Sequence, residues 1–366
     1  MLRASHIIYE NATKNVSENK GGCPMVSIKD IASKAGVSIS TVSRTLNHYA
    51  DVNPRTRDKI FKIAKELNYF PNAVARSLVQ KKTHTIGVFF GNKTNSGFDH
   101  PFFQDVISAV REVVGNAGYD LLVFTNKNKE RATYTTLSKE RSVDGIVLLL
   151  TGEGKKWDHQ LTELQESGIP CTAIDVPLVG EKCGFVESDN FSGAKQAIEH
   201  LISLGHTTIA FIGGDEISKT SFDRLRGYQQ ALMDHKLGLD PTLVRLGYFI
   251  KEKAMEETRN LIETGKQITA FFAASDEMAM GVIEALTAIG LRVPEDVSVV
   301  GFDDIREAAY FRPALTTIRQ NKYKLGSTAA EVLLKIIENT GPSSCPVVLP
   351  CELIVRESTA ACSRRE

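Results

Sequence analysis

Residues 26–47 read VSIKDIASKAGVSISTVSRTLN, and this stretch decides the fold of the amino-terminal region. Apolar side chains recur at the i, i+3, i+4, i+7 spacing of one helix face, at Ile28, Ile31, Ala32 and Ala35. Ser27 comes just before this run and Asp30 three residues later, which is the pattern of a capping box. The sequence therefore predicts a short helix that begins after Ser27.

A second short helix follows after a tight turn. Gly36 can adopt the left-handed conformation that ends a helix, Val37 can pack between the two helices, and Ser38 can cap the next one. Val42 and Leu46 would face inward. The outward face is mostly short and hydrogen-bonding, with one long arginine: Ile39, Ser40, Thr41, Ser43, Arg44 and Asn47. Such a face, together with Ser38 at the start of the helix, suits the major groove of DNA, where an arginine can reach guanine O6 and N7.

A third helix completes this region. Asn53 and Pro54 supply an N-cap and a proline at the first helical position, and the apolar stripe repeats at Ile60, Ile63, Ala64 and Leu67. Three short helices with this turn predict an all-α helix-turn-helix head. A three-helix bundle with no role in nucleic-acid binding is the alternative.

Charge is distributed unevenly along the chain. Residues 25–84 hold eleven basic and four acidic side chains, a net charge of +7, although the whole chain is neutral with 44 of each sign. From Thr85 onward the net charge is −8. Because phosphate binding needs lysine and arginine gathered in one module, this asymmetry favours a polyanion-binding head on a core that does not bind polyanions. Ordinary solvated charge is the alternative.

The head also carries a collinear set of motifs, at Ser27–Ala32, Ala35–Ser38, Thr41–Arg44, Leu46–Asn47 and Tyr69–Leu78. These motifs resemble the LacI/GalR family of bacterial transcription repressors. The resemblance implies a DNA-binding domain over residues 25–70 and a hinge over 71–84 that becomes helical only in a dimer on DNA. It implies DNA contacts from Asn72 and from Leu78, the latter as a wedge in the minor groove. For Leu78 the alternative is a linker side chain packed on the core.

The rest of the chain has ordinary globular composition. Its total of 366 residues suits two or three units at about 150 residues each. The longest apolar runs, such as 145–150, fall far short of the ~20 residues that cross a bilayer, and the first residues do not read as a secretory signal. The six cysteines lack a CxxC pair or a histidine cluster, so we expect free thiols in the cytoplasm, with no metal or other cofactor.

From Thr85 short apolar runs alternate with stretches of helix length. The predicted strands are 86–90, 119–125, 145–150, 170–174, 208–212, 243–248, 269–273, 297–301 and 315–318. The predicted helices are 102–117, 130–141, 193–204, 221–236, 253–264, 277–288 and 323–338. This order predicts an α/β core of two Rossmann-like lobes with parallel sheets. A ligand cleft is expected between the lobes, at the carboxyl ends of the strands.

Motifs for catalysis or nucleotide binding are missing from the sequence. No GxGxxG follows the first predicted strand, and no GxxxxGK[ST] occurs anywhere. The eight histidines are scattered, and none stands in a nucleophile motif. An enzyme is therefore not predicted.

The resemblance to the LacI/GalR family extends over the core, to about residue 357. It rests on Gly205–His206, Arg224–Tyr228, Ser275–Gly281, Pro294–Asp304 and Leu315–Ile318. It implies a periplasmic-binding-protein-like fold, with Asp175, Arg224 and Asp276 contacting an effector whose vicinal hydroxyls suit such charged groups. It also implies an aromatic platform, from Phe249 and from Phe102 or Phe103. The alternatives are core packing for each aromatic and helix N-capping for Asp276.

The resemblance also implies domain boundaries. We expect a core over 85–358, with one lobe of about 85–187 and 317–349, the other of about 188–316 and 350–358, and a tail over 359–366. Residues 1–24 have no counterpart in the family, so we expect either a disordered arm or a start site placed too early, with Met25 as the natural first residue. No leucine heptads follow Glu357, which favours a homodimer.

These features together predict a ligand-responsive transcriptional repressor. A homodimer would bind a double-stranded, pseudo-palindromic operator, and a small-molecule effector, first of all a carbohydrate, would change its affinity for that operator. A periplasmic sugar-binding protein shares the two-lobed core but would need a secretory signal and no basic head. A nucleotide-using α/β enzyme would need a phosphate loop.

Overall fold

The computed structural model describes residues 26–47, 49–69, 82–91, 98, 100–124, 133–150, 156–340 and 346–362, with the backbone alone at 156–158. The chain divides into two compact units, and the boundary lies between Thr83 and His84. The extension before Met25 and most of the expected hinge, including Asn72 and Leu78, lie outside the described residues.

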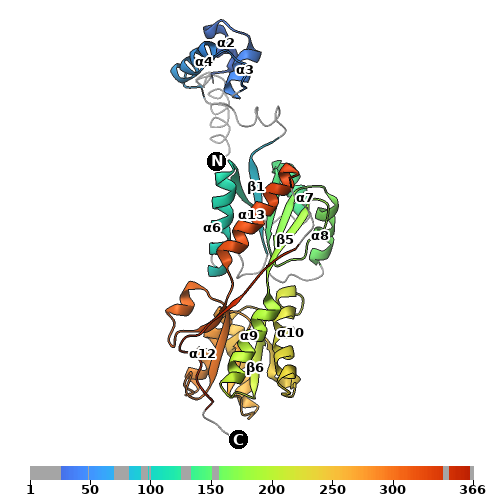
Figure 1. Ribbon diagram of the computed structural model, residues 1–366, viewed down its shortest axis with the longest axis vertical. Helices are drawn as coiled ribbons and strands as arrows, with labels where there is room; N and C mark the ends of the chain where they lie inside the picture. Colours follow the sequence, from blue (N-terminus) through green and yellow to red (C-terminus); the bar gives the residue numbers. More distant parts are fainter. Residues whose placement is uncertain are drawn as a thin grey trace, which may run out of the picture. The chain divides into compact units, whose positions relative to one another are not determined.

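The first unit contains the three predicted helices (Figure 1). They are α2 (Ile28–Ala35), α3 (Ile39–Leu46) and α4 (Pro54–Glu66). Ile31, Val42 and Ile60, one from each helix, have no exposed surface and form the centre of a small apolar core. Asn53 caps α4 and Pro54 is its first residue, as the sequence predicts.

The first lobe of the second unit is built on a six-stranded sheet in the order β11-β5-β4-β3-β1-β2. Its strands are β1 (Thr85–Phe90), β2 (Asp120–Phe124), β3 (Gly145–Leu149), β4 (Cys171–Ile174), β5 (Cys183–Ser188) and β11 (Val347–Leu349), all paired in parallel. Helices α6 (Pro101–Asn116) and α13 (Lys322–Glu338) pack together. So do α7 (Tyr134–Arg141) and α8 (Lys156–Glu166), and Figure 1 shows this second pair beside β5.

The second lobe is built on another six-stranded sheet, in the order β12-β10-β9-β8-β6-β7. Its strands are β6 (Ile209–Gly213), β7 (Val244–Leu246), β8 (Ala270–Ala273), β9 (Ser298–Asp303), β10 (Thr316–Arg319) and β12 (Glu352–Ile354), of which only β12 runs antiparallel. Its helices form two packed pairs, α9 (Asn190–Ser203) with α10 (Lys219–Asp234) and α11 (Lys251–Glu263) with α12 (Asp276–Ala288). Short 3-10 turns, η1 (Pro241–Leu243) and η2 (Arg306–Ala309), complete it.

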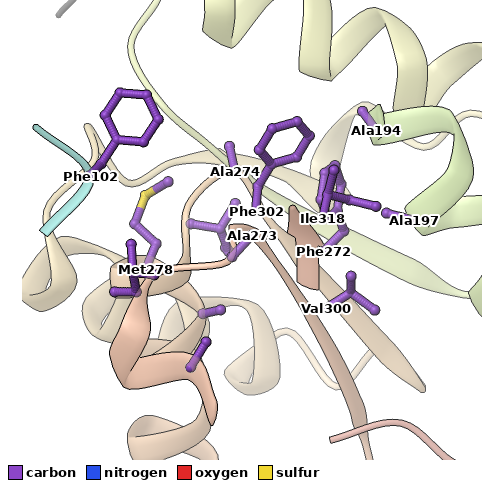
Figure 2. Packing of buried hydrophobic residues seen from close by; sticks show 14 of the residues in the cluster. Phe102, Ala194, Ala197, Phe272, Ala273, Ala274, Met278, Val300, Phe302 and Ile318 are labelled. Carbon is purple, nitrogen blue, oxygen red and sulfur yellow. The ribbon is translucent and has the colours of Figure 1, made fainter. Parts of the chain in front are cut away.

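The apolar core of the second lobe fills the space between its helices and its sheet. Figure 2 shows Phe272 of β8 and Phe302 of β9 among these residues, with Ala194 of α9 on one side and Met278 of α12 on the other. Phe272, Phe302, Ala194 and Met278 have no exposed surface. The apolar runs that predicted the strands are therefore buried on both sheet faces, as parallel sheets require.

The chain passes between the lobes three times, and one passage differs from the expected boundary. The passages follow β5, β10 and β11. The sequence placed the return to the first lobe at residue 317, but β10 pairs with β9 inside the second sheet, with Thr317 opposite Gly301. The second lobe consequently extends through Arg319, and the first lobe resumes with α13.

No helix among the described residues is both long enough and apolar enough to cross a membrane.

Candidate functional site

The turn between α2 and α3 is built as the sequence predicts. The backbone N–H and the hydroxyl of Ser27 each donate to the Asp30 carboxylate at 2.8 Å, and these bonds lower the pKa of Asp30. Gly36 ends α2 in the left-handed conformation, with φ of 66°. Ser38 then accepts a hydrogen bond from the Thr41 N–H at 3.1 Å and caps α3. These caps fix where α3 begins and hence which of its side chains face outward.

The outward face of α3, together with its N-cap Ser38, contains the seven residues that the sequence singles out as DNA contacts in the head. Ser38, Ile39, Ser40 and Arg44 are exposed, whereas Thr41, Ser43 and Asn47 are partly exposed. Val42 is fully buried, and Leu46 packs at the edge of the same core. Thr45 is also fully buried, and its hydroxyl donates to the Thr41 carbonyl at 2.8 Å. The face is therefore available to a partner.

Arg44 is the one long cation on this face, and the structure pairs it within the head. Its guanidinium forms a two-point contact with the Asp51 carboxylate and lies 5.3 Å from the centre of the Tyr49 ring. The side chains of Arg44 and Asp51 are 52% and 53% exposed. Exposed ion pairs of this kind contribute at most ~1 kcal/mol, so Arg44 can exchange this partner for a base or a phosphate at little cost.

A second group of polar residues lies in the core, where strands of both lobes end. Asp175 follows β4 in the first lobe, and Asp303 is the last residue of β9 in the second. Arg224 projects from α10, and electrostatic attraction links it to both carboxylates. We call Asp175, Arg224, Asp276, Asp303, His100 and Glu277 the interlobe cluster.

Arg224 is the centre of this cluster and is only 3% exposed. Its Nε donates to the Asn190 side-chain oxygen at 2.9 Å, and its Nη1 donates to the Ala274 carbonyl. Nη1 also lies 3.6 Å from Asp303 Oδ1. Asn190 begins α9, just after the chain enters the second lobe, so Arg224 connects the passage between the lobes to the ends of β8 and β9.

The carboxyl groups of the cluster are held in an environment that favours their neutral forms. Burial raises the pKa of Asp175 to about 6, although Arg224 opposes the shift. Burial likewise raises the pKa of Asp303 and of Glu277. Asp175 also has a left-handed backbone, with φ of 59°, which is uncommon for a residue other than glycine. Asp175 and Asp303 share one buried arginine, and perturbed carboxyls in such a group are typical of a functional site.

Asp276 has no exposed surface, and both of its oxygens are engaged within the second lobe. The Thr317 hydroxyl donates to Oδ1, and the Ile305 N–H donates to Oδ2 at 2.8 Å. The N-cap of α12 is Ser275, which accepts from the Met278 N–H at 3.3 Å. Asp276 therefore holds together the segments after β9 and at β10, and contact between its carboxylate and an effector stays a prediction.

The three predicted aromatics occupy different positions. Phe102 and Phe103, in the first turn of α6, are 6% and 4% exposed and meet edge to face with ring centres 5.2 Å apart. Phe249, after β7, has φ of 57°, and its ring lies over Gly214, where a Cβ would be only 2.2 Å away. Figure 2 places Phe102 at the edge of the apolar group that includes Phe302 and Met278. Their role as a platform for a sugar ring stays a prediction.

His100 and Glu277 form a contact between the lobes that the sequence did not reveal. His100 caps α6 in the first lobe, and its Nδ1 accepts from the Phe102 N–H at 3.2 Å. Its Nε2 lies 3.6 Å from a carboxylate oxygen of Glu277, the second residue of α12. Sequence patterns cannot place two residues 177 positions apart side by side. Asp303 could have been found, because it lies two residues after a predicted strand and within a family motif.

Comparison with known proteins identifies both parts of the chain. Residues 27–72 match the family of bacterial regulatory proteins, lacI family, and residues 198–359 match a periplasmic binding protein-like domain. The probable transcriptional repressor ExuR of Bacillus subtilis is 34% identical over 334 residues, which cover 91% of this chain and 98% of ExuR. The regulator CelR of Thermobifida fusca is also 34% identical, over 90% of this chain and 96% of CelR.

Solved structures of lacI-family regulators also superpose on this chain. A lac repressor dimer bound to operator and the anti-inducer ONPF superposes with a TM-score of 0.78 at 28% identity, over 92% of this chain and 99% of that one. A complex of the transcriptional regulator CelR with cellobiose has a TM-score of 0.69 at 31% identity, over 91% of this chain and 99% of that one. The chain therefore belongs to the lacI family of bacterial regulatory proteins and is a DNA-binding transcriptional regulator.

Proposed function

We propose that this chain represses transcription as a homodimer on an operator, and that a sugar bound at the interlobe cluster sets its affinity for that operator. The observation that carries the proposal is Arg224, a buried guanidinium that attracts Asp175 of the first lobe and Asp303 of the second. A ligand that exchanges contacts with this cluster acts on both lobes at once.

The chemistry of the cluster favours a polyhydroxy ligand. Carboxylates accept hydrogen bonds from hydroxyl groups, and a guanidinium donates hydrogen bonds to hydroxyl oxygens. Vicinal hydroxyls can therefore satisfy both kinds of group. The solved CelR relative was crystallised with cellobiose, which supports a sugar here. A purine base lacks vicinal hydroxyls, and the experiment below separates it from neutral sugars and from sugar acids.

On the DNA side, we propose that α3 enters the major groove with Ser38, Ile39, Ser40, Thr41, Ser43, Arg44 and Asn47, that Asn72 contacts DNA, and that Leu78 contacts the minor groove. The lac repressor relative is a dimer on its operator, which supports two copies of α3 on successive half-sites. Acting on chromosomal DNA implies a cytoplasmic protein, and we assign it no catalytic role.

The effector would act through the arrangement of the lobes. His100 of the first lobe and Glu277 of the second are 3.6 Å apart, so their contact depends on how closely the lobes approach. A ligand can shift this arrangement only by binding its two states with different affinity. The contact between His100 and Glu277 thus joins the two lobes, and a change in their arrangement would alter it.

A thermal-shift panel followed by operator binding tests the proposal. The full chain is heated with neutral disaccharides, hexuronates and purine bases. A true effector raises the midpoint of thermal unfolding, because it binds the folded state and not the unfolded chain. The active compound is then added during titration of an operator duplex. A neutral sugar that both raises the midpoint and changes operator affinity supports the proposal. Activity of a purine base alone overturns the choice of ligand, and unchanged operator affinity overturns the regulation.

A further inference from the structure

Two cysteines lie side by side within the first lobe, away from the interlobe cluster. Cys171 is the first residue of β4 and Cys183 the first of β5, and the two are direct partners in the register of this strand pair. Their sulfur atoms are 3.0 Å apart, with the Cys171 thiol donating to the Cys183 sulfur. Both are free thiols.

The positions of the two residues suit a covalent bond between them. Neighbouring strands lie ~4.8 Å apart, and disulfides join Cα atoms separated by ~4.4–6.8 Å. As register partners, both side chains lie on the same face of the sheet, where they pack with Ile146 and Phe185 in one apolar cluster. The backbone therefore needs little movement for the two sulfurs to join.

The hydrogen bond makes the two thiols chemically unequal. The bond from Cys171 lowers the pKa of Cys183, and the same bond, together with burial, raises the pKa of Cys171. Because the thiolate is the reactive form of cysteine, Cys183 is the nucleophile of the pair and Cys171 is the thiol that resolves its oxidised form.

The loop between β4 and β5 covers the Cys183 sulfur. Gly180 lies above it in the loop between β4 and β5, and a Cβ built on Gly180 would be 3.2 Å from that sulfur. Gly180 itself is partly exposed, although Cys171 and Cys183 are 0% and 1% exposed. The Cys183 N–H donates to the Gly180 carbonyl at 3.2 Å, so a local opening that breaks this bond would expose the Cys183 sulfur.

We infer that Cys171 and Cys183 are a redox-active dithiol, which a peroxide converts reversibly into a disulfide between β4 and β5. In the first step the Cys183 thiolate attacks one peroxide oxygen, the O–O bond breaks, and Cys183 sulfenic acid and one water form after uptake of a proton. In the second step the Cys171 sulfur attacks the sulfenic sulfur, and its proton leaves with the hydroxide as a second water. Two thiols lose two electrons, and one peroxide is reduced to two waters.

The bond would tie together two strands that end at the interlobe cluster. Asp175 follows β4 directly, and Glu187 and Ser188 end β5, where the Ser188 N–H donates to Asp175 at 3.4 Å. Cys171 and Cys183 thus begin β4 and β5, and Asp175 lies at the other end of the same strand pair. In a reducing compartment the pair rests as thiols, and only oxidative stress closes it.

Peptide mapping of the full chain after treatment with hydrogen peroxide tests this inference. Lys182 lies between the two cysteines, so trypsin separates residues 157–182 from 183–195 unless a disulfide joins them. We expect the joined peptides to appear with peroxide, an intact mass lower by two hydrogens, and full reversal by dithiothreitol. Oxidation of Cys351 or Cys362 while Cys171 and Cys183 remain open to alkylation under denaturing conditions overturns the inference.

Two alanine variants test the separate roles. With Cys171→Ala, peroxide should leave Cys183 as a sulfenic acid that dimedone traps, because nothing resolves it. With Cys183→Ala, Cys171 should stay a thiol. Equal trapping at Cys171 and Cys183 in the two variants, or none in either, overturns the assignment of nucleophile and resolving thiol. The wild-type peptide map tests disulfide formation without the variants, so the inference stays testable even if a variant fails to fold.

Discussion

The guanidinium of Arg224 lies over the ring of Phe302, with its central carbon 3.7 Å from the ring centre. This contact holds the cation against the apolar core of the second lobe while its Nε and Nη1 donate to Asn190 and Ala274. Phe302 precedes Asp303 on β9, so one strand supplies both the ring and a carboxylate for Arg224. The orientation of the guanidinium is thus set before any ligand arrives.

Replacing Arg224 with lysine should weaken effector binding while the chain stays folded. Lysine lacks the planar fork, and a hydrogen bond to a charged group contributes about 1.5–3 kcal/mol, so we expect affinity to fall roughly 10- to 100-fold. Calorimetric titration with the active sugar measures this. Arg226→Lys is the matched control, because Arg226 follows two residues later on α10 and is 55% exposed. Equal losses in the two variants would contradict the role of Arg224.

Replacing Asp175 with asparagine should change how stability depends on pH. The folded pKa of Asp175 is about 6, above its ordinary 3.8, so between these values the folded protein keeps a proton that the unfolded chain has lost. This carboxyl therefore makes the wild type less stable as pH rises through that window, by up to ~3 kcal/mol. The melting temperature of Asp175→Asn minus that of the wild type should consequently increase from pH ~4 to pH ~7. A constant difference would show that Asp175 titrates normally, and a decreasing one that folding lowers its pKa; either result contradicts the raised pKa.

Replacing Arg44 with alanine should reduce discrimination between operator and random DNA. A side chain that reads a base contributes about 1–3 kcal/mol to specific binding, whereas loss of a phosphate contact weakens all sequences alike. Anisotropy titrations with both duplexes at fixed salt measure the ratio of affinities. Lys34→Ala serves as the control, because Lys34 is an exposed cation of α2 that pairs with Glu66. If Arg44→Ala weakens both duplexes equally, Arg44 contacts phosphate and not a base.

Replacing Gly36 with alanine should destabilise the helix-turn-helix without any steric clash. Gly36 has φ of 66°, and an added Cβ would meet nothing within 4 Å. The cost is therefore conformational, about 1–2 kcal/mol for an L-residue in the left-handed region. Hydrogen exchange of the α2 and α3 amides should accelerate. Gly115→Ala, in α6, also meets open space but keeps a helical backbone, so it should stabilise its helix by up to ~1 kcal/mol. Slower exchange in Gly36→Ala would refute the account of this turn.

The head could be predicted from sequence almost to the residue, because local signals fix it. Ser27, Gly36, Ser38 and Asn53 each perform the capping role that their identity predicts. Nine of the twelve strands in the described part of the core are predicted from apolar runs, with ends shifted by at most two residues. These runs are long enough to cover both sheet faces, which makes them visible without tertiary information.

Three other strands, β5, β11 and β12, have too weak a sequence pattern to be predicted. β5 reads CGFVES, in which apolar and polar residues are mixed, and β11 and β12 have three residues each. The sheet to which β10 belongs depends on its partner β9, not on its own sequence. Arg224 and Asp276 of the interlobe cluster could be proposed from the family motifs. The contact of His100 with Glu277 could not, because it joins residues of different lobes.

Reciprocal binding measurements on the full chain test the central claim most directly. If the sugar changes operator affinity by some factor, operator DNA must change sugar affinity by the same factor, because both ligands act on one equilibrium. We predict a factor of roughly 5–150 in each direction for the wild type, and a factor near one for Arg224→Lys at sugar concentrations that saturate the wild type. Operator affinity that is the same with and without saturating sugar in the wild type would contradict the claim.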